Sequence, residues 1–197
     1  MVRIYLETGK KTTSEYVFVD TIIKHWGISS EKYEIECVNG KDSLHQLKNK
    51  MQETTLEGGI NLVIFDADSA DNGGGFEKRK SILLQQLEDM KVEASLFLFP
   101  DNQNDGDVEV LMETLVLKDK HKRFFSCYNG YEMCLGDEYQ APNLKGKLST
   151  YISAQKGLTK KQRNSLGSGQ WLFDDKDYWD IDRDTLKPLK DFILKVF

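Results

Sequence analysis

Two carboxylates follow a buried strand pattern in the middle of the chain. Residues 60–65 are almost all apolar and have no helical period, which is typical of a strand buried on both faces. Asp66 and Asp68 come directly after this run, two positions apart. Ligands of open parallel sheets bind at the carboxyl ends of the strands, and hard divalent cations prefer carboxylate oxygens. The pattern therefore predicts a metal site at this edge of a sheet.

Two simpler interpretations of the same acidic run have to be weighed. Aspartates after a strand also serve as turn and helix-cap residues, so residues 66–71 could form a solvated loop. The run could also be mistaken for a calcium-binding loop, but the glycine and distal glutamate of an EF-hand are not in place. We reject the EF-hand and keep the metal site and the solvated loop as alternatives.

Strand and helix patterns alternate through the first 117 residues. This alternation predicts right-handed crossovers, a parallel sheet and an α/β fold. In the helix expected after the glycines at 73–75, we expect Arg79 to face water. The predicted strands lie at 2–6, 32–38, 60–65 and 94–99, and the predicted helices at 14–26, 44–51, 76–90 and 107–117.

The second part of the chain is less regular. The periodicity weakens after residue 117, so we expect irregular structure over 118–143, a helix over 143–155 and an amphipathic helix over 185–197. The predicted organisation is an α/β domain at 1–117 and an extension at 118–197 that packs on it and ends in a helix. The expected architecture is a three-layer sandwich with a mainly parallel four-stranded sheet and a small, α-rich C-terminal extension.

Composition and charge argue against a general nucleic-acid-binding or membrane-binding protein. The chain has 197 residues, 39% of them hydrophobic, and a net charge of −5, so it has no general attraction to nucleic acid or to anionic membranes. A basic cluster over 145–163 could follow a nucleic-acid backbone, although a solvated helix face is the alternative. We expect a cytoplasmic protein without a membrane partner, because no apolar stretch could span a bilayer and no signal peptide is evident.

The acidic positions, taken together, resemble a known domain. Glu7 ends the first strand, Asp66 and Asp68 end the third, and residues 39–41 (Asn-Gly-Lys) follow the second. This arrangement resembles the TOPRIM fold, a metal-binding domain of topoisomerases, bacterial primases, OLD-type nucleases and small maturation nucleases. The turn at 99–102, residues 106–109 and the C-terminal pattern from Trp179 to Phe192 resemble stand-alone TOPRIM-like bacterial proteins whose function is not established.

The resemblance implies roles for three acidic residues. Glu7 would act as general acid or base or help to bind metal, while Asp66 and Asp68 would coordinate Mg²⁺ or Mn²⁺. A divalent cation neutralises the charge that develops in a phosphodiester reaction and can activate water.

Further residues could complete such a site. The resemblance places Glu109 and Asp101 at the neighbouring strand edge, where they could complete a metal shell or orient waters. Lys10, Lys11 and Lys41 could approach a phosphate.

The chain also departs from the better-known TOPRIM enzymes. Thr8 and Gly9 stand where the first motif usually has a glycine and a nearby aspartate, and we identify no tyrosine as a topoisomerase nucleophile. Two functions stay open. The first is a Mg-dependent, nuclease-like enzyme acting on phosphodiester bonds of nucleic acid or nucleotides. The second is a non-catalytic protein that binds metal, nucleotide or a protein partner, such as an ATPase in defence or repair.

Overall fold

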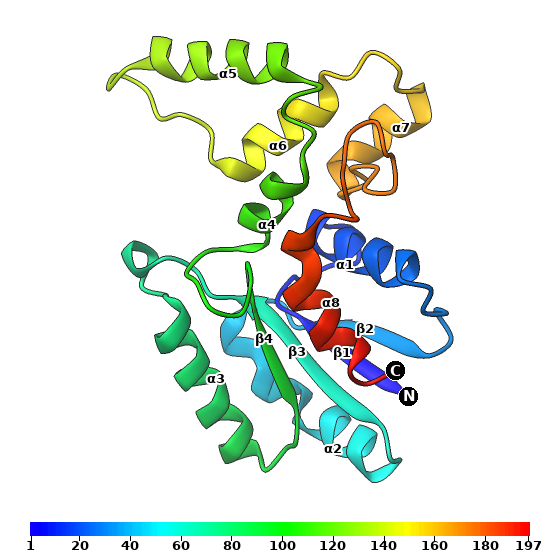
Figure 1. The fold of residues 1–197 in the computed structure, drawn as a ribbon. Helices are drawn as coiled ribbons and strands as arrows, with labels where there is room; N and C mark the ends of the chain where they lie inside the picture. Colours follow the sequence, from blue (N-terminus) through cyan, green and yellow to red (C-terminus); the bar gives the residue numbers. More distant parts are fainter.

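Four parallel strands form a single sheet at the centre of the protein (Figure 1). The computed structural model describes residues 1–197, apart from the side chain of Asn72. The strand order is β2-β1-β3-β4, with β1 at Val2–Leu6, β2 at Tyr33–Cys37, β3 at Ile60–Asp66 and β4 at Ser95–Phe99. The predicted α/β fold with a parallel four-stranded sheet is confirmed.

The strand register brings the carboxyl ends of the strands to one edge. Leu6 pairs with Cys37 on one side and with Ile64 on the other, and Asp66 pairs with Phe99. The polar residues that follow β1 and β3 therefore emerge side by side.

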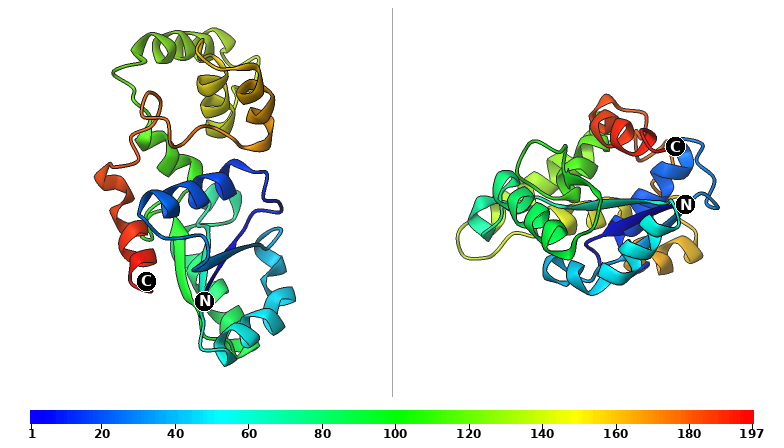
Figure 2. Two further views of the ribbon diagram at one scale, coloured as in Figure 1. Left: turned by 90° about the vertical axis from the view of Figure 1, so that its right-hand side faces the viewer. Right: turned by 90° about the horizontal axis from the view of Figure 1, so that it is seen from below.

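Helices cover both faces of the sheet and give three layers (Figures 1 and 2). Successive strand residues point to opposite faces, so Ile4, Leu62 and Phe97 belong to one core while Tyr5, Val63 and Leu98 belong to the other. The first core packs against α1 (Ser14–His25), α4 (Val108–Leu115) and α8 (Lys187–Leu194). The second packs against the 3-10 helix η1 (Lys41–Leu47), α2 (Lys48–Leu56) and α3 (Phe76–Met90).

Three helices lie beyond the carboxyl edge of the sheet: α5 (Lys122–Leu135), α6 (Leu144–Ser153) and α7 (Lys160–Ser165) (Figure 1). The expectation of irregular structure over 118–143 was wrong, because α5 occupies more than half of it. Only Phe125 and Tyr128 of α5 are buried. The helix predicted over 143–155 is confirmed as α6. No helix among the residues that the structure describes combines the length and the apolar character needed to cross a membrane.

The chain returns to the sheet at its C-terminal end. In α8, Leu189 and Ile193 are buried, and the ring of Phe192 lies 5.3 Å from that of Phe97 in β4. The last helix therefore packs against β4 of the sheet. Three short 3-10 helices complete the fold: η2 (Ala70–Asn72), η3 (Leu166–Ser168) and η4 (Asp184–Leu186).

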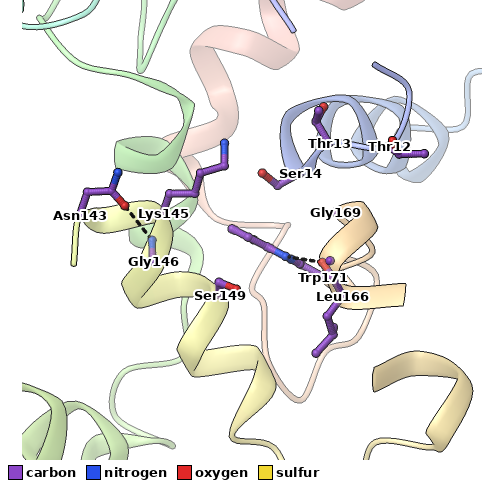
Figure 3. Close-up of a pocket in the computed structure, with 11 residues that line it drawn as sticks. Thr12, Thr13, Ser14, Asn143, Lys145, Gly146, Ser149, Leu166, Gly169 and Trp171 are labelled. Carbon is purple, nitrogen blue, oxygen red and sulfur yellow. Dashed lines mark hydrogen bonds between the residues drawn. The ribbon is translucent and has the colours of Figure 1, made fainter. Parts of the chain in front are cut away.

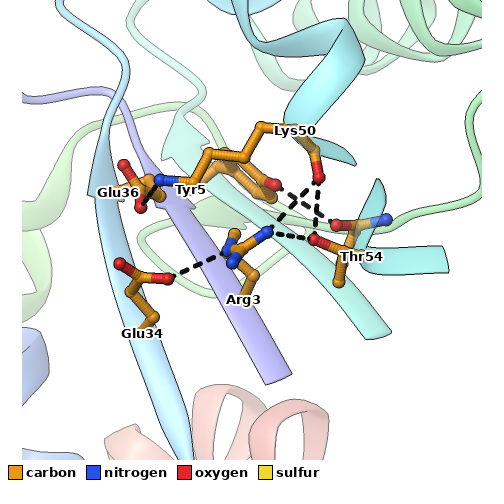
Figure 4. A network of polar contacts seen from close by, with 7 residues as sticks. Arg3, Tyr5, Glu34, Glu36, Lys50 and Thr54 are labelled. Atoms are coloured by element: carbon orange, nitrogen blue, oxygen red, sulfur yellow. Dashed lines mark hydrogen bonds and ion pairs between the residues drawn. The ribbon is translucent and has the colours of Figure 1, made fainter. Parts of the chain in front are cut away.

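A polar network ties α2 to the amino-terminal half of the sheet (Figure 4). The Arg3 guanidinium donates from Nε to Glu34 Oε2 at 3.1 Å and from Nη1 to Thr54 Oγ1 at 2.5 Å. Lys50 pairs with Glu36 in the same region. Because each charge has a partner here, this network stabilises the fold.

Candidate functional site

Glu7 and Asp66 meet at the carboxyl edge of the sheet. The backbone N–H of Asp66 donates to Oε2 of Glu7 at 3.3 Å. Burial raises the pKa of Glu7, and the charge of Asp68 adds to this, although the hydrogen bond from Asp66 and the charges of Arg79 and Lys41 oppose it. The carboxyl of Glu7 therefore binds its proton more tightly at this edge than a glutamate does in water.

Asp66 joins the end of β3 to the start of α4. Its Oδ1 accepts a hydrogen bond from the backbone N–H of Val108 at 2.9 Å. Burial raises the pKa of Asp66 well above its usual value, and the neighbouring charges of Glu15, Glu7 and Glu109 raise it further. With Asp107, four other carboxylates are thus close enough to repel it.

Glu15 is a member of this cluster that the sequence analysis missed. It lies in the first turn of α1, is 7% exposed, and its Oε1 has no hydrogen-bond partner in the part of the chain that the structure describes. Burial, followed by the charges of Glu7 and Glu109, raises the pKa of Glu15 to about 8. The sequence held a signal for this position. Thr13 is a helix-capping residue shortly after the first strand, and a helix that begins there places Glu15 in its first turn, at the same edge of the sheet.

Glu109 is the fourth carboxylate of the cluster and forms an ion pair with a lysine. It is 6% exposed in the first turn of α4, and its Oε1 lies 2.7 Å from Nζ of Lys145 in α6. Burial lowers the pKa of Lys145, but the hydrogen bond to Glu109 and the surrounding carboxylates outweigh it and raise that pKa. One residue of the basic cluster over 145–163 therefore belongs to the acidic edge of the sheet.

Asp68 is held differently from Asp66. Its backbone is left-handed, with φ of 58°, and its carbonyl oxygen accepts a hydrogen bond from the N–H of Gly106 at 3.0 Å. Its carboxylate pairs with Arg79, which is only 4% exposed. The expectation that Arg79 faces water was wrong, because Asp68 supplies the counter-charge that lets a guanidinium be buried on α3.

Asp101 is bonded within its own turn. Its Oδ1 accepts hydrogen bonds from the backbone N–H groups of Gln103 at 3.1 Å and Asn104 at 2.9 Å. These bonds and the one from the Asn104 side chain lower the pKa of Asp101 despite partial burial. Local turn stabilisation accounts for these contacts of Asp101.

The three predicted phosphate-binding lysines differ in their surroundings. Lys10 and Lys11 are exposed in the loop between β1 and α1, and Nζ of Lys11 lies 6.0 Å from the centroid of the Tyr16 ring. Lys41 begins η1, and its charge lowers the pKa of Glu7. Lys41 is thus the member of this set that acts on the carboxylate cluster.

The donor chemistry of the edge fits a hard divalent cation. Glu7, Glu15 and Asp66 offer carboxylate oxygens, and the buried Oε1 of Glu15 lacks a partner. Among the residues described, however, no three Asp, Glu, His or Cys side chains already form a group that could hold a metal ion. The carboxylates would have to draw together around a cation.

Comparisons with known proteins carry no functional description. A search of curated proteins and a search of solved structures each found no match. Residues 12–197 match a family described as a protein of unknown function, DUF3226. The chain therefore belongs to the DUF3226 family.

Proposed function

We propose that the protein is TOPRIM-like, binds Mg²⁺ or Mn²⁺ at the carboxyl edge of its sheet, and acts on phosphodiester bonds of nucleic acid or nucleotides. The observation that carries the proposal is a cluster of four carboxylates, of which Glu15 and Glu109 are buried and Glu7 and Asp66 are half-buried. Burying like charges is unfavourable unless they hold protons or a cation. The positions of these residues after parallel strands and at helix starts also suit a ligand site.

The chain's own residues divide into binding and proton-handling groups. Asp66 and Glu7 are the proposed metal ligands, and Asp68 could join them only by leaving its partner Arg79. Glu15, with a pKa near 8, can hold or release a proton at neutral pH and is the proposed general acid or base. When bound, the cation would neutralise developing negative charge and lower the pKa of a bound water.

The contact between Asp68 and Arg79 favours a second candidate function. A carboxylate that is neutralised by a buried guanidinium is a poor metal ligand, so the edge could bind metal or nucleotide without turnover. Such a protein would serve a partner, for example an ATPase in defence or repair. Hydrolysis of an oligonucleotide or a nucleotide by the isolated chain would rule this function out.

Calorimetric titration of the metal-free protein with MgCl₂ and MnCl₂ tests the cation site. We expect wild type to bind and Asp66→Asn to lose binding, because the amide is a weaker ligand for a hard cation. The variant should fold, since an amide oxygen can still accept the hydrogen bond from Val108. Asp101→Asn is the matched control and should bind like wild type.

Two results would overturn the cation site. One is wild type that shows neither heat nor thermal stabilisation with millimolar metal. The other is Asp66→Asn that binds as tightly as wild type. If the site is established, turnover of single-stranded and double-stranded oligonucleotides and of nucleotides, compared between wild type and Glu15→Gln, separates the catalytic from the non-catalytic function.

A further inference from the structure

A cavity of about 460 Å³ separates the start of α1 from the start of α6 (Figure 3). Its wall combines hydroxyl, amide and ammonium groups with one indole ring. The lining residues that matter for binding are Thr12, Ser14, Asn143, Lys145, Ser149 and Trp171.

Ser14 has a buried hydroxyl with no partner. The residue is 3% exposed, and among the groups described its Oγ makes no hydrogen bond. In Figure 3 this side chain lies across the cavity from Lys145. A buried hydroxyl without a hydrogen bond costs about 1–3 kcal/mol, so the arrangement points to a ligand atom that accepts from Ser14.

The lining of the cavity offers positive charge and hydrogen-bond donors to an anion, although its lysine, Lys145, also pairs with Glu109 of the adjacent carboxylate cluster. Both bordering helices, of 12 and 10 residues, begin here and direct the positive ends of their dipoles toward it. Asn143 Oδ1 accepts from the N–H of Gly146 at 2.9 Å, which leaves the Asn143 amide nitrogen as a donor. Lys145 is the one charged side chain among the described lining residues, and none of these carries a carboxylate.

The cavity adjoins the carboxylate cluster. Ser14 precedes Glu15 in α1, and Lys145 reaches from the cavity to Glu109. The indole of Trp171 forms an apolar wall and is fixed by a hydrogen bond from its Nε1 to the carbonyl oxygen of Leu166 at 3.2 Å. A ligand group in the cavity would therefore lie next to the proposed reaction site.

We propose that this cavity binds a phosphate group of the substrate, held by the Ser14 hydroxyl, the Lys145 ammonium and the N-terminal ends of the two helices. The phosphate could belong to a nucleotide or to a nucleic-acid strand. The role of the cavity in turnover rests on the proposed function, but phosphate binding itself needs no metal.

Inorganic phosphate is the first probe, titrated into the full-length chain in EDTA. Ser149→Asp puts a negative charge into the cavity wall and should weaken binding at least about tenfold, through repulsion at short range. Ser149→Asn has nearly the same size without the charge and should stay within about threefold of wild type. Ser14→Ala removes the unpartnered donor and should weaken binding about threefold or more.

The outcomes separate this proposal from the metal site. Asp66→Asn, which removes a negative charge near Lys145, should bind phosphate at least as tightly as wild type even if no metal binds, so failure of the metal site leaves phosphate binding intact. No binding of phosphate to wild type at 10 mM, or equal binding by Ser149→Asp and Ser149→Asn, would overturn the proposal.

Two further titrations identify which kind of molecule supplies the phosphate. A nucleoside 5′-monophosphate and a short single-stranded oligonucleotide are each titrated into Ser149→Asp and Ser149→Asn. The ligand whose affinity falls only with the aspartate is the one that uses the cavity. If neither affinity differs between the two variants, the cavity is not a substrate subsite.

Discussion

Replacing Glu15 with glutamine should make the metal-free protein more stable, and increasingly so as the pH rises. The folded protein binds the Glu15 proton more tightly than the unfolded chain does, because burial and neighbouring carboxylates raise its pKa from 4.5 to about 8. This carboxyl costs no stability below its unfolded pKa, and its cost grows as the pH rises from the unfolded pKa of 4.5 to the folded pKa of about 8, above which it levels off. At pH 7 the cost is on the order of 3 kcal/mol.

Urea unfolding in EDTA at several pH values between 5 and 9 measures the effect. The free energy of unfolding of Glu15→Gln should match that of wild type near pH 5 and exceed it by about 1–3 kcal/mol at pH 8, since coupling among the carboxyls spreads the cost. Glu31→Gln, at an exposed position, is the matched control and should follow wild type. Parallel curves for Glu15→Gln and wild type across this range would refute the assignment of a buried, proton-binding carboxyl.

Other predictions concern contacts around the site. Asp68→Asn should lower the free energy of unfolding by about 2 kcal/mol because it leaves Arg79 buried without a counter-charge, and urea unfolding of the double variant with Arg79→Met should show a smaller loss. Gly169→Ala should lower the free energy of unfolding by about 2 kcal/mol, because φ of Gly169 is +73° and a Cβ there would lie 2.2 Å from the backbone of Thr13. Gly167→Ala, with open space around it, is the control, and equal unfolding midpoints for the two glycine variants would contradict the reasoning. Mg²⁺ affinity should rise from pH 6 to pH 8, as calorimetry can measure.

The sheet could be predicted because its signals are local and strong. The apolar runs at 60–65 and 94–99 and the polar residues after each strand are sufficient to place the strand ends. From this edge, Glu7 and Asp66 could be expected to meet, and their hydrogen bond agrees with that expectation.

The parts that could not be predicted depend on tertiary partners. The burial of Arg79 depends on Asp68, which is 11 positions away and approaches it only through a left-handed turn. The placement of α5 depends on α6, because Phe125 packs on Tyr151 of α6, with ring centroids 5.3 Å apart. Lys145 could not be assigned to the acidic edge, since that requires knowing that α6 packs on α4.

The balance of charge at the carboxyl edge determines how a cation could bind. Lys145 is paired with Glu109 and Arg79 with Asp68, so the charges of Glu7, Glu15 and Asp66 have no cation paired with them among the contacts described. Without metal, burial and mutual repulsion raise the pKa values of these three carboxyls, that of Glu15 to about 8, so the edge binds protons more tightly than free carboxyls in water do. The proposed divalent cation would have to displace those protons, so its binding should release them and become tighter as the pH rises. The same burial that makes the metal-free edge costly would therefore make the proposed cation binding strongly pH-dependent.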